Sequence, residues 1–144
     1  KPRSGKTLLA KSLAKRLDLV HVSVENWIKD LAERVKNYEP PEDQEPPYPE
    51  WRTPLECRVW DECLAKGAGP SQEDIIEILQ TQCQSATART KGFVLDLNFY
   101  KSKAPWAKII RDSKLLGEDS NGVDLLFSSI VELDMDDDEV KLRA

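Results

Sequence analysis

Residues 1–7 read Lys-Pro-Arg-Ser-Gly-Lys-Thr, and an amphipathic pattern follows them directly. Over residues 8–17, apolar side chains recur at helical spacing, with lysines and an arginine between them. The stretch therefore predicts a glycine turn that leads into the N-terminus of a helix. Backbone N–H groups at such a turn form a cradle for phosphate oxygens. Ser4 and Gly5 would lie in the cradle, Lys6 would neutralise the phosphates, and the Thr7 hydroxyl would be offered to Mg²⁺.

Composition narrows the classes of protein to consider. The chain has 144 residues, of which 40% are hydrophobic, and this is enough for one domain with a modest core. A net charge of −5 argues against a general nucleic-acid binder. No apolar run approaches the roughly 18 residues of a membrane span. The three cysteines lack C-x-x-C spacing, so we expect reduced thiols and a cytoplasmic protein rather than a disulfide framework or a zinc site.

Three short apolar runs predict β-strands. Residues 19–24 form the first, and residues 92–97 form a continuous apolar run that contains Asp96 and predicts a strand buried on both faces. Residues 127–133, closed by Asp134, predict a third strand. Helical spacing separates these runs. It predicts helices around residues 27–35, 55–64, 72–83 and 104–116, and another from 136 to 144. Asp18 and Leu19 break the first helical stretch, and Ser71 to Asp74 are typical of the N-cap of the helix at 72–83. The alternation of strands and helices indicates an α/β fold with a largely parallel sheet.

The segment from Tyr38 to Pro54 departs from this alternation. It holds six prolines and five carboxylates. Because proline removes an amide donor and opposes helix formation, we expect a loop or a disordered insertion here. Trp51 in this segment and Trp60 just beyond it fit a partner-binding surface, although Trp60 fits a core position equally well.

Asp96 is the second candidate for chemistry. An aspartate at the C-terminal end of a buried strand lies where open α/β sheets bind ligands. Next to a phosphate-binding loop, it would hold a Mg²⁺-bound water. Asp134 has a weaker claim, and the carboxylates at 134–139 lack the glycine and the spacing of a calcium loop. His21 is the sole histidine, and we expect it to be a packing residue rather than a ligand.

The order of the motifs resembles that of adenylate kinase and related nucleoside-monophosphate kinases. The motifs run P-R-S-G-K-T, V-H-V-S-V, G-x-G-P-S-Q-E-D, G-F-V-L-D and I-V-E-L-D, and together they span nearly the whole chain. The resemblance implies a P-loop NTPase-like three-layer sandwich with a parallel sheet, incomplete at both ends because the first strand, the lid and the C-terminal elements would be missing. Residues 1–144 would then be a partial domain with an insertion at 38–54.

The resemblance implies a preserved donor half and a degraded acceptor half. Gly5, Lys6, Thr7 and Asp96 match the positions that hold ATP and Mg²⁺ in the family, and Arg143 matches an arginine that lies against the donor nucleotide. In the acceptor half, Lys29 stands where the family places an arginine that binds the AMP phosphate.

The second acceptor arginine is also missing. Residues 97–100 read Leu-Asn-Phe-Tyr where the family has G-F-P-R, and Ala104 stands in place of a glutamine. Lys101 or Lys103 could substitute only approximately, because lysine cannot form the bidentate fork of arginine.

Two functions of different class remain open. The first is a diverged adenylate-kinase-like domain that binds ATP, or serves as a structural module, beside other domains and protein partners. Proteins similar to this occur in cilia and flagella. The second is an active nucleoside-monophosphate kinase that uses Lys29, Lys101 and Lys103. A P-loop kinase with another acceptor, such as shikimate, fits the motif order less well.

Overall fold

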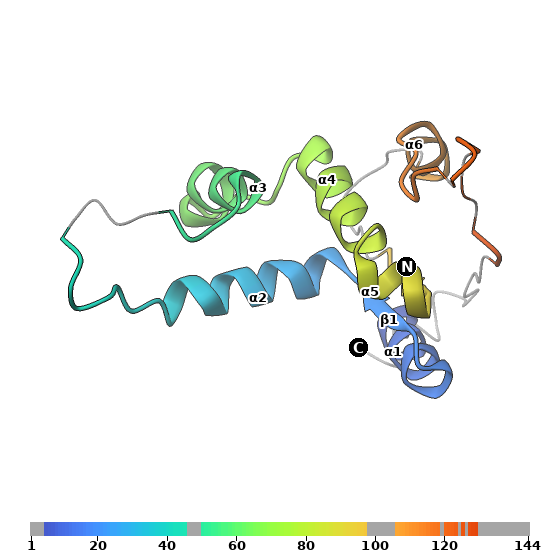
Figure 1. Ribbon diagram of the computed structural model, residues 1–144, viewed down its shortest axis with the longest axis horizontal. Coiled ribbons are helices and arrows are strands. Elements are labelled where there is room, and N and C mark those ends of the chain that lie inside the picture. The colour runs from blue at the N-terminus through green and yellow to red at the C-terminus, as the bar shows by residue number, and fades with distance from the viewer. Residues whose placement is uncertain are drawn as a thin grey trace, which may run out of the picture. The chain divides into compact units, whose positions relative to one another are not determined.

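A computed structural model describes residues 5–45, 50–97, 106–118, 120–123, 125 and 127–129 (Figure 1). The chain divides into two compact units. Unit 1 comprises residues 1–23 and 79–144, and unit 2 comprises residues 24–78. Within the described ranges, none of the helices combines the length and the hydrophobicity needed to cross a lipid bilayer.

Unit 1 contains a parallel pair of strands. Strand β1 (Val20–Val22) pairs with β2 (Phe93–Leu95), with His21 opposite Val94. Helix α1 (Lys6–Leu17) packs on both strands, and α5 (Ala86–Lys91) leads directly into β2. Helix α6 (Trp106–Asp112) follows later in the chain. Unit 1 is therefore mixed α/β with parallel pairing, as the sequence predicted.

Helix α1 is held by small residues on its inner face. Ala10 and Ala14 are buried, and they allow the helix to approach the strands closely. The helix ends at Asp18, which adopts the left-handed conformation with φ 51°. The Asp18 N–H donates to the Ala14 carbonyl, and Lys91 Nζ lies 2.9 Å from Asp18 Oδ1. This cap turns the chain into β1, where the sequence predicted a break.

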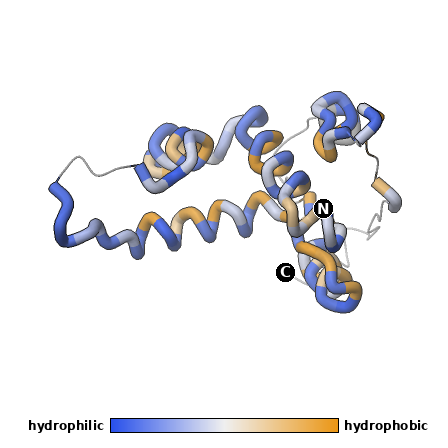
Figure 2. Tube along the Cα trace, viewed as in Figure 1, coloured by the Kyte–Doolittle hydropathy of each residue, from blue (hydrophilic) through white to orange (hydrophobic). Residues whose placement is uncertain are grey.

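Unit 2 is helical and has its own core. It contains α2 (Val24–Lys36), α3 (Pro54–Cys57), a π-helical turn η1 (Arg58–Cys63), a 3₁₀ turn η2 (Leu64–Lys66) and the first part of α4 (Gln72–Cys83). Hydrophobic residues recur along α2 between hydrophilic ones (Figure 2). The core consists of four buried side chains, those of Leu31, Leu55, Val59 and Ile78. Trp27 and Trp60 pack against them. Trp60 is partly buried and packs against this core, which is closer to the core position than to the surface position predicted for it.

Local hydrogen bonds explain where the helices of unit 2 begin. Thr53 and Glu56 form a reciprocal capping box at the start of α3, with Pro54 at the first helical position. Ser71 and Asp74 cap α4 in the same way, since the Asp74 N–H donates to Ser71 Oγ at 3.1 Å and the Ser71 N–H donates to Asp74 Oδ2 at 3.3 Å. The predicted N-cap at Ser71 is confirmed.

Several sequence predictions need correction. The first strand is shorter than residues 19–24, because Val24 already begins α2. Strand β2 is half-buried rather than buried on both faces within the described part of the chain. Residues 127–129, predicted to start a third strand, have no strand structure. The predicted loop ends one residue earlier than expected, because Pro54 is already helical.

Other predictions concern residues outside the described ranges. These are Ser4, Lys101, Lys103, Ala104, the strand end at Asp134, the helix at 136–144, and Arg143.

Candidate functional site

The N-terminus of α1 has the geometry of the predicted glycine turn. Gly5 is the N-cap and has φ 85°, a left-handed conformation that side chains other than glycine rarely adopt. Lys6 and Thr7 are the first two residues of the helix, and the Leu9 N–H donates to the Gly5 carbonyl at 2.9 Å. The first turn of α1 contains no acidic side chain. The positive end of the helix dipole is therefore not neutralised from within its own first turn.

Asp96 follows β2 directly and is buried. Only 4% of the residue is exposed, and its N–H donates to the Val22 carbonyl at 2.9 Å. This hydrogen bond extends the parallel ladder by one step and fixes the Asp96 backbone at the C-terminal end of the sheet. The predicted strand-end position of Asp96 is confirmed.

His21 lies beside Asp96. Side chains alternate along a strand, so Asp96 lies on the same face as Val94, which is the register partner of His21. His21 Nε2 is 3.4 Å from Asp96 Oδ2, a distance at which a protonated histidine forms an ion pair. Asp96 Oδ2 is buried, and it accepts no hydrogen bond of good geometry from the described residues. His21 therefore packs at the sheet, as predicted, but it also faces the aspartate proposed for chemistry.

Asp96 and Thr7 carry oxygen atoms of the kind that Mg²⁺ takes as ligands. The described part of the chain has no group of three or more histidine, cysteine, aspartate and glutamate side chains arranged to hold a metal. Mg²⁺ commonly takes only one or two protein oxygens and completes its shell with waters and phosphate oxygens. Asp96 offers one such carboxylate oxygen, and Thr7 lies on α1 in the same unit.

The structure describes one of the two acceptor candidates, Lys29. Lys29 lies on α2 in unit 2, with its side chain 67% exposed and its Nζ 2.7 Å from Glu25 Oε1. The ammonium of Lys29 is thus already paired with a neighbour one helical turn away. Lys101, the other predicted acceptor residue, is outside the described ranges.

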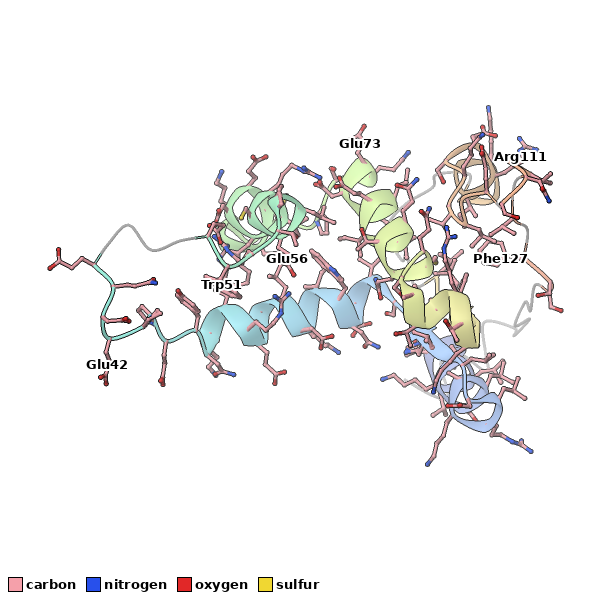
Figure 3. All side chains as sticks on the ribbon, in the orientation of Figure 1. Glu42, Trp51, Glu56, Glu73, Arg111 and Phe127 are labelled. Carbon is pink, nitrogen blue, oxygen red and sulfur yellow. The ribbon has the colours of Figure 1, made fainter. Side chains whose placement is uncertain are left out.

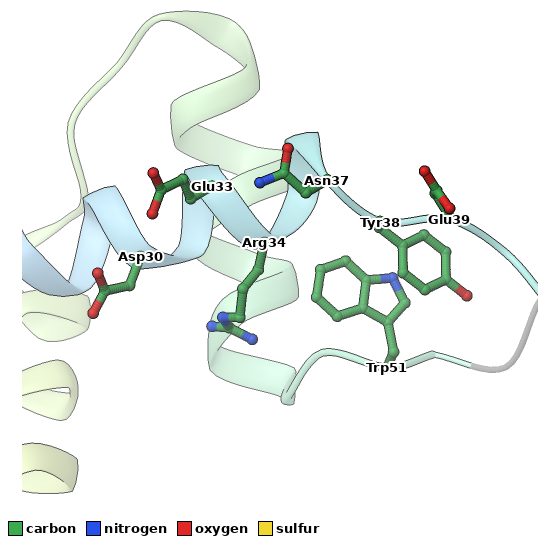
Figure 4. Close-up of a pocket in the computed structure, with 7 residues that line it drawn as sticks. All are labelled: Asp30, Glu33, Arg34, Asn37, Tyr38, Glu39 and Trp51. Carbon is green, nitrogen blue, oxygen red and sulfur yellow. The ribbon is translucent and has the colours of Figure 1, made fainter.

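An aromatic and acidic hollow on unit 2 was not predicted as a site. Tyr38 and Trp51 stack with their ring centroids 4.6 Å apart and an angle of 13° between the ring planes. Side chains of α2 and this pair line a surface hollow of about 770 Å³ (Figure 4); the lining residues are Asp30, Glu33, Arg34, Asn37, Tyr38, Glu39 and Trp51. The sequence predicts a partner-binding surface at Trp51, but only the fold shows that Tyr38 is its stacking partner.

Ion pairs fix the cations around Trp51. The guanidinium carbons of Arg34 and Arg52 each lie 5.9 Å from the Trp51 ring centroid. Arg34 pairs with Glu56, which projects from α3 toward α2 (Figure 3). Arg52 bonds to Glu50 at 3.0 Å, and this hydrogen bond lowers the pKa of Glu50.

Comparison with protein-family models, with curated proteins and with solved structures finds no match to this chain.

Proposed function

We propose that this chain is a diverged adenylate-kinase-like domain that binds ATP with Mg²⁺ through unit 1 and whose AMP-acceptor site is degraded. The observation that carries the proposal is the combination within one unit of a left-handed Gly5 before Lys6 and Thr7 and a buried Asp96 at the end of a parallel strand. P-loop proteins hold a triphosphate with a glycine turn at a helix N-terminus and an aspartate after a parallel strand, and these features support the proposal. In this proposal, the parallel strand pair is part of a P-loop sandwich.

Each residue would have a separate task. The Gly5 turn would let the backbone N–H groups at the start of α1 approach phosphate oxygens, because no Cβ stands in the way. Lys6 would neutralise phosphate charge, and the Thr7 hydroxyl would be a ligand of Mg²⁺. Asp96 would accept hydrogen bonds from a water on the metal, using the oxygen that lacks a hydrogen-bond donor among the described residues. The bound Mg²⁺ would supply charge neutralisation between the phosphates.

The loss of acceptor residues supports a domain that binds ATP but does not transfer its phosphoryl group efficiently to AMP. Phosphoryl transfer depends mostly on positioning and on charge stabilisation, so loss of the acceptor clamp removes much of the rate. Lys29, at the position of a family arginine, has its charge taken up by Glu25. We therefore expect weak or no AMP binding. The domain would act as a nucleotide-binding or structural module beside protein partners. The family resemblance extends this proposal to a location in the axoneme of cilia or flagella.

Calorimetric titration of the 144-residue chain with Mg²⁺-ATP and, separately, with AMP tests the proposal. Lys6→Ala is the test variant. Lys11→Ala is the matched control, because Lys11 is an exposed lysine on the same helix. We expect ATP binding that Lys6→Ala abolishes and Lys11→Ala preserves, with no heat from AMP.

Two results would change the conclusion. Saturable binding of both nucleotides would favour the active kinase, and a phosphoryl-transfer assay would then decide between the two functions. Absence of ATP binding in the unmodified chain, with its circular dichroism showing intact helices, would reject the nucleotide-binding proposal and leave a structural module.

A further inference from the structure

We infer that the hollow on unit 2 is a docking site for a basic segment of a partner protein, one that presents arginine or lysine side chains to the stacked rings of Tyr38 and Trp51. All seven lining residues of this aromatic–acidic hollow belong to unit 2. The inference is therefore independent of the nucleotide-binding proposal for unit 1.

The stacked pair gives the hollow a fixed aromatic wall. Tyr38 follows α2 closely, and Trp51 lies just before α3, so the stack joins the two ends of the proline-rich segment. Both rings are half-buried, which leaves part of each at the surface. A loop closed by its own ring stack loses less conformational freedom on binding, because its wall is already formed.

The charge in the hollow is negative. Asp30, Glu33 and Glu39 contribute carboxylates and form no ion pair within the described ranges. Arg34 and Arg52 bring cations near Trp51, but Arg34 is paired with Glu56, and Arg52 is paired with Glu50 and Asp61. The spacing of Asp30, Glu33 and Arg34 places them on one face of α2, and Asn37 follows in the turn at its end. The hollow thus presents uncompensated negative charge beside aromatic rings.

Charge complementarity selects the occupant. Phosphate-bearing ligands, including nucleotides and nucleic acids, would be repelled by the carboxylates of Asp30, Glu33 and Glu39. A guanidinium or ammonium group would be attracted to them, while the planar guanidinium or the methylene stem stacks on the rings. Arginine fits both features best, because one flat cation can face a ring and hydrogen-bond to carboxylates at the same time.

The probe for this site is a rhodamine-labelled peptide of alternating arginine and alanine, titrated with the full chain at low ionic strength and followed by fluorescence polarisation. A peptide of alternating glutamate and alanine with the same dye is the control ligand. We expect saturable binding of the arginine peptide only, and weaker binding as salt is added.

Two double variants distinguish the effect of the charges in the hollow on peptide binding from the effect of the net charge of the protein. Asp30→Asn with Glu33→Gln removes two charges from the hollow. Glu62→Gln with Glu73→Gln removes two exposed charges elsewhere on unit 2, so the net charge of the two proteins is the same. We expect the first pair to weaken peptide binding about tenfold and the second less than about twofold.

Trp51→Leu tests the aromatic wall. It should weaken binding of the arginine peptide more than that of a matched lysine peptide, because guanidinium stacks on an indole better than ammonium does. Equal weakening by the two double variants would overturn the inference, as would binding of the glutamate peptide or failure to bind the arginine peptide. Self-association in sedimentation that suppresses peptide binding would also overturn it, by making a second copy of this chain the occupant.

Discussion

His21, in the second pair of a three-pair parallel ladder, lies beside Asp96, which directly follows the third pair, with Nε2 of the histidine 3.4 Å from Oδ2 of the aspartate. The relationship follows from register, since Asp96 lies two residues beyond Val94, the partner of His21. Both atoms are buried, and neither has a hydrogen-bond partner of good geometry among the described residues. The other Asp96 contact, from its N–H to the Val22 carbonyl, fixes the backbone.

Replacing Asp96 with asparagine should separate metal-dependent from metal-independent ATP binding. If Asp96 holds a Mg²⁺-bound water, as proposed, affinity for ATP in Mg²⁺ should fall about ten- to hundredfold, whereas affinity in EDTA should hardly change. Calorimetry under both conditions measures this. Asp18→Asn is the matched control, because Asp18 is in the same unit and its side chain is 86% exposed. An equal loss of affinity in EDTA would show that Asp96 does not act through the metal.

Truncating Leu31 should unfold unit 2 at lower denaturant concentration. Leu31 is fully buried in the core of that unit, and a leucine-to-alanine change at such a site costs about 2–5 kcal/mol. Trp27 and Trp60 pack against this core, so tryptophan fluorescence in urea reports the transition. Leu17→Ala on α1 should change stability by less than about 0.5 kcal/mol, because Leu17 is 61% exposed. A similar effect of both substitutions would contradict the assignment of the core.

The spacing of apolar residues, together with residues that cap or end helices, predicted most of the helices and the two paired strands of the fold. Asp18 ends α1 and Ser71 caps α4 where the sequence indicated, because these signals act within one turn of chain. Helix α5 was not predicted. Its sequence Ala-Thr-Ala-Arg-Thr-Lys has no apolar stripe, and its one signal is the Ser85 side chain that accepts from the Ala88 N–H.

The parts of the candidate sites that depend on distant contacts could not be predicted. Asp96 was identified from its place after an apolar run, but its contact with His21 depends on strand register, which no local signal specifies. The stack of Tyr38 on Trp51 likewise joins residues on opposite sides of a proline-rich segment. The predicted burial of β2 on both faces was wrong for the described residues, since hydrophobic sequence alone does not show what covers a strand.

The Glu56 carboxylate should make the stability of unit 2 depend on pH in the acid range. Burial alone would raise the pKa of Glu56, but hydrogen bonds from Arg34 and from the Thr53 N–H outweigh it and hold the pKa below its ordinary value of 4.5. The unfolded chain then binds the proton more readily than the folded one. The stabilisation is present above that ordinary value and is lost as the pH falls through the lower folded pKa.

Glu56→Gln measures this contribution. It should destabilise the protein by about 1–3 kcal/mol at neutral pH, because Arg34 loses its carboxylate and the cap of α3 is weakened. Urea titrations from about pH 6 to about pH 3 should show the difference between the two proteins shrinking as the pH falls. A difference that stays constant with pH would show that Glu56 acts by packing and not through its charge.

Cys83 should be the least reactive of the three free thiols. It is 2% exposed, and burial raises the pKa of its thiol to about 12. Since the thiolate is the nucleophile, both access and ionisation oppose its alkylation. Mass spectrometry after brief iodoacetamide treatment near neutral pH should show the peptide of half-buried Cys63 modified well before that of Cys83. Denaturation in urea should abolish the difference, and early labelling of Cys83 in the folded protein would show that α4 opens locally.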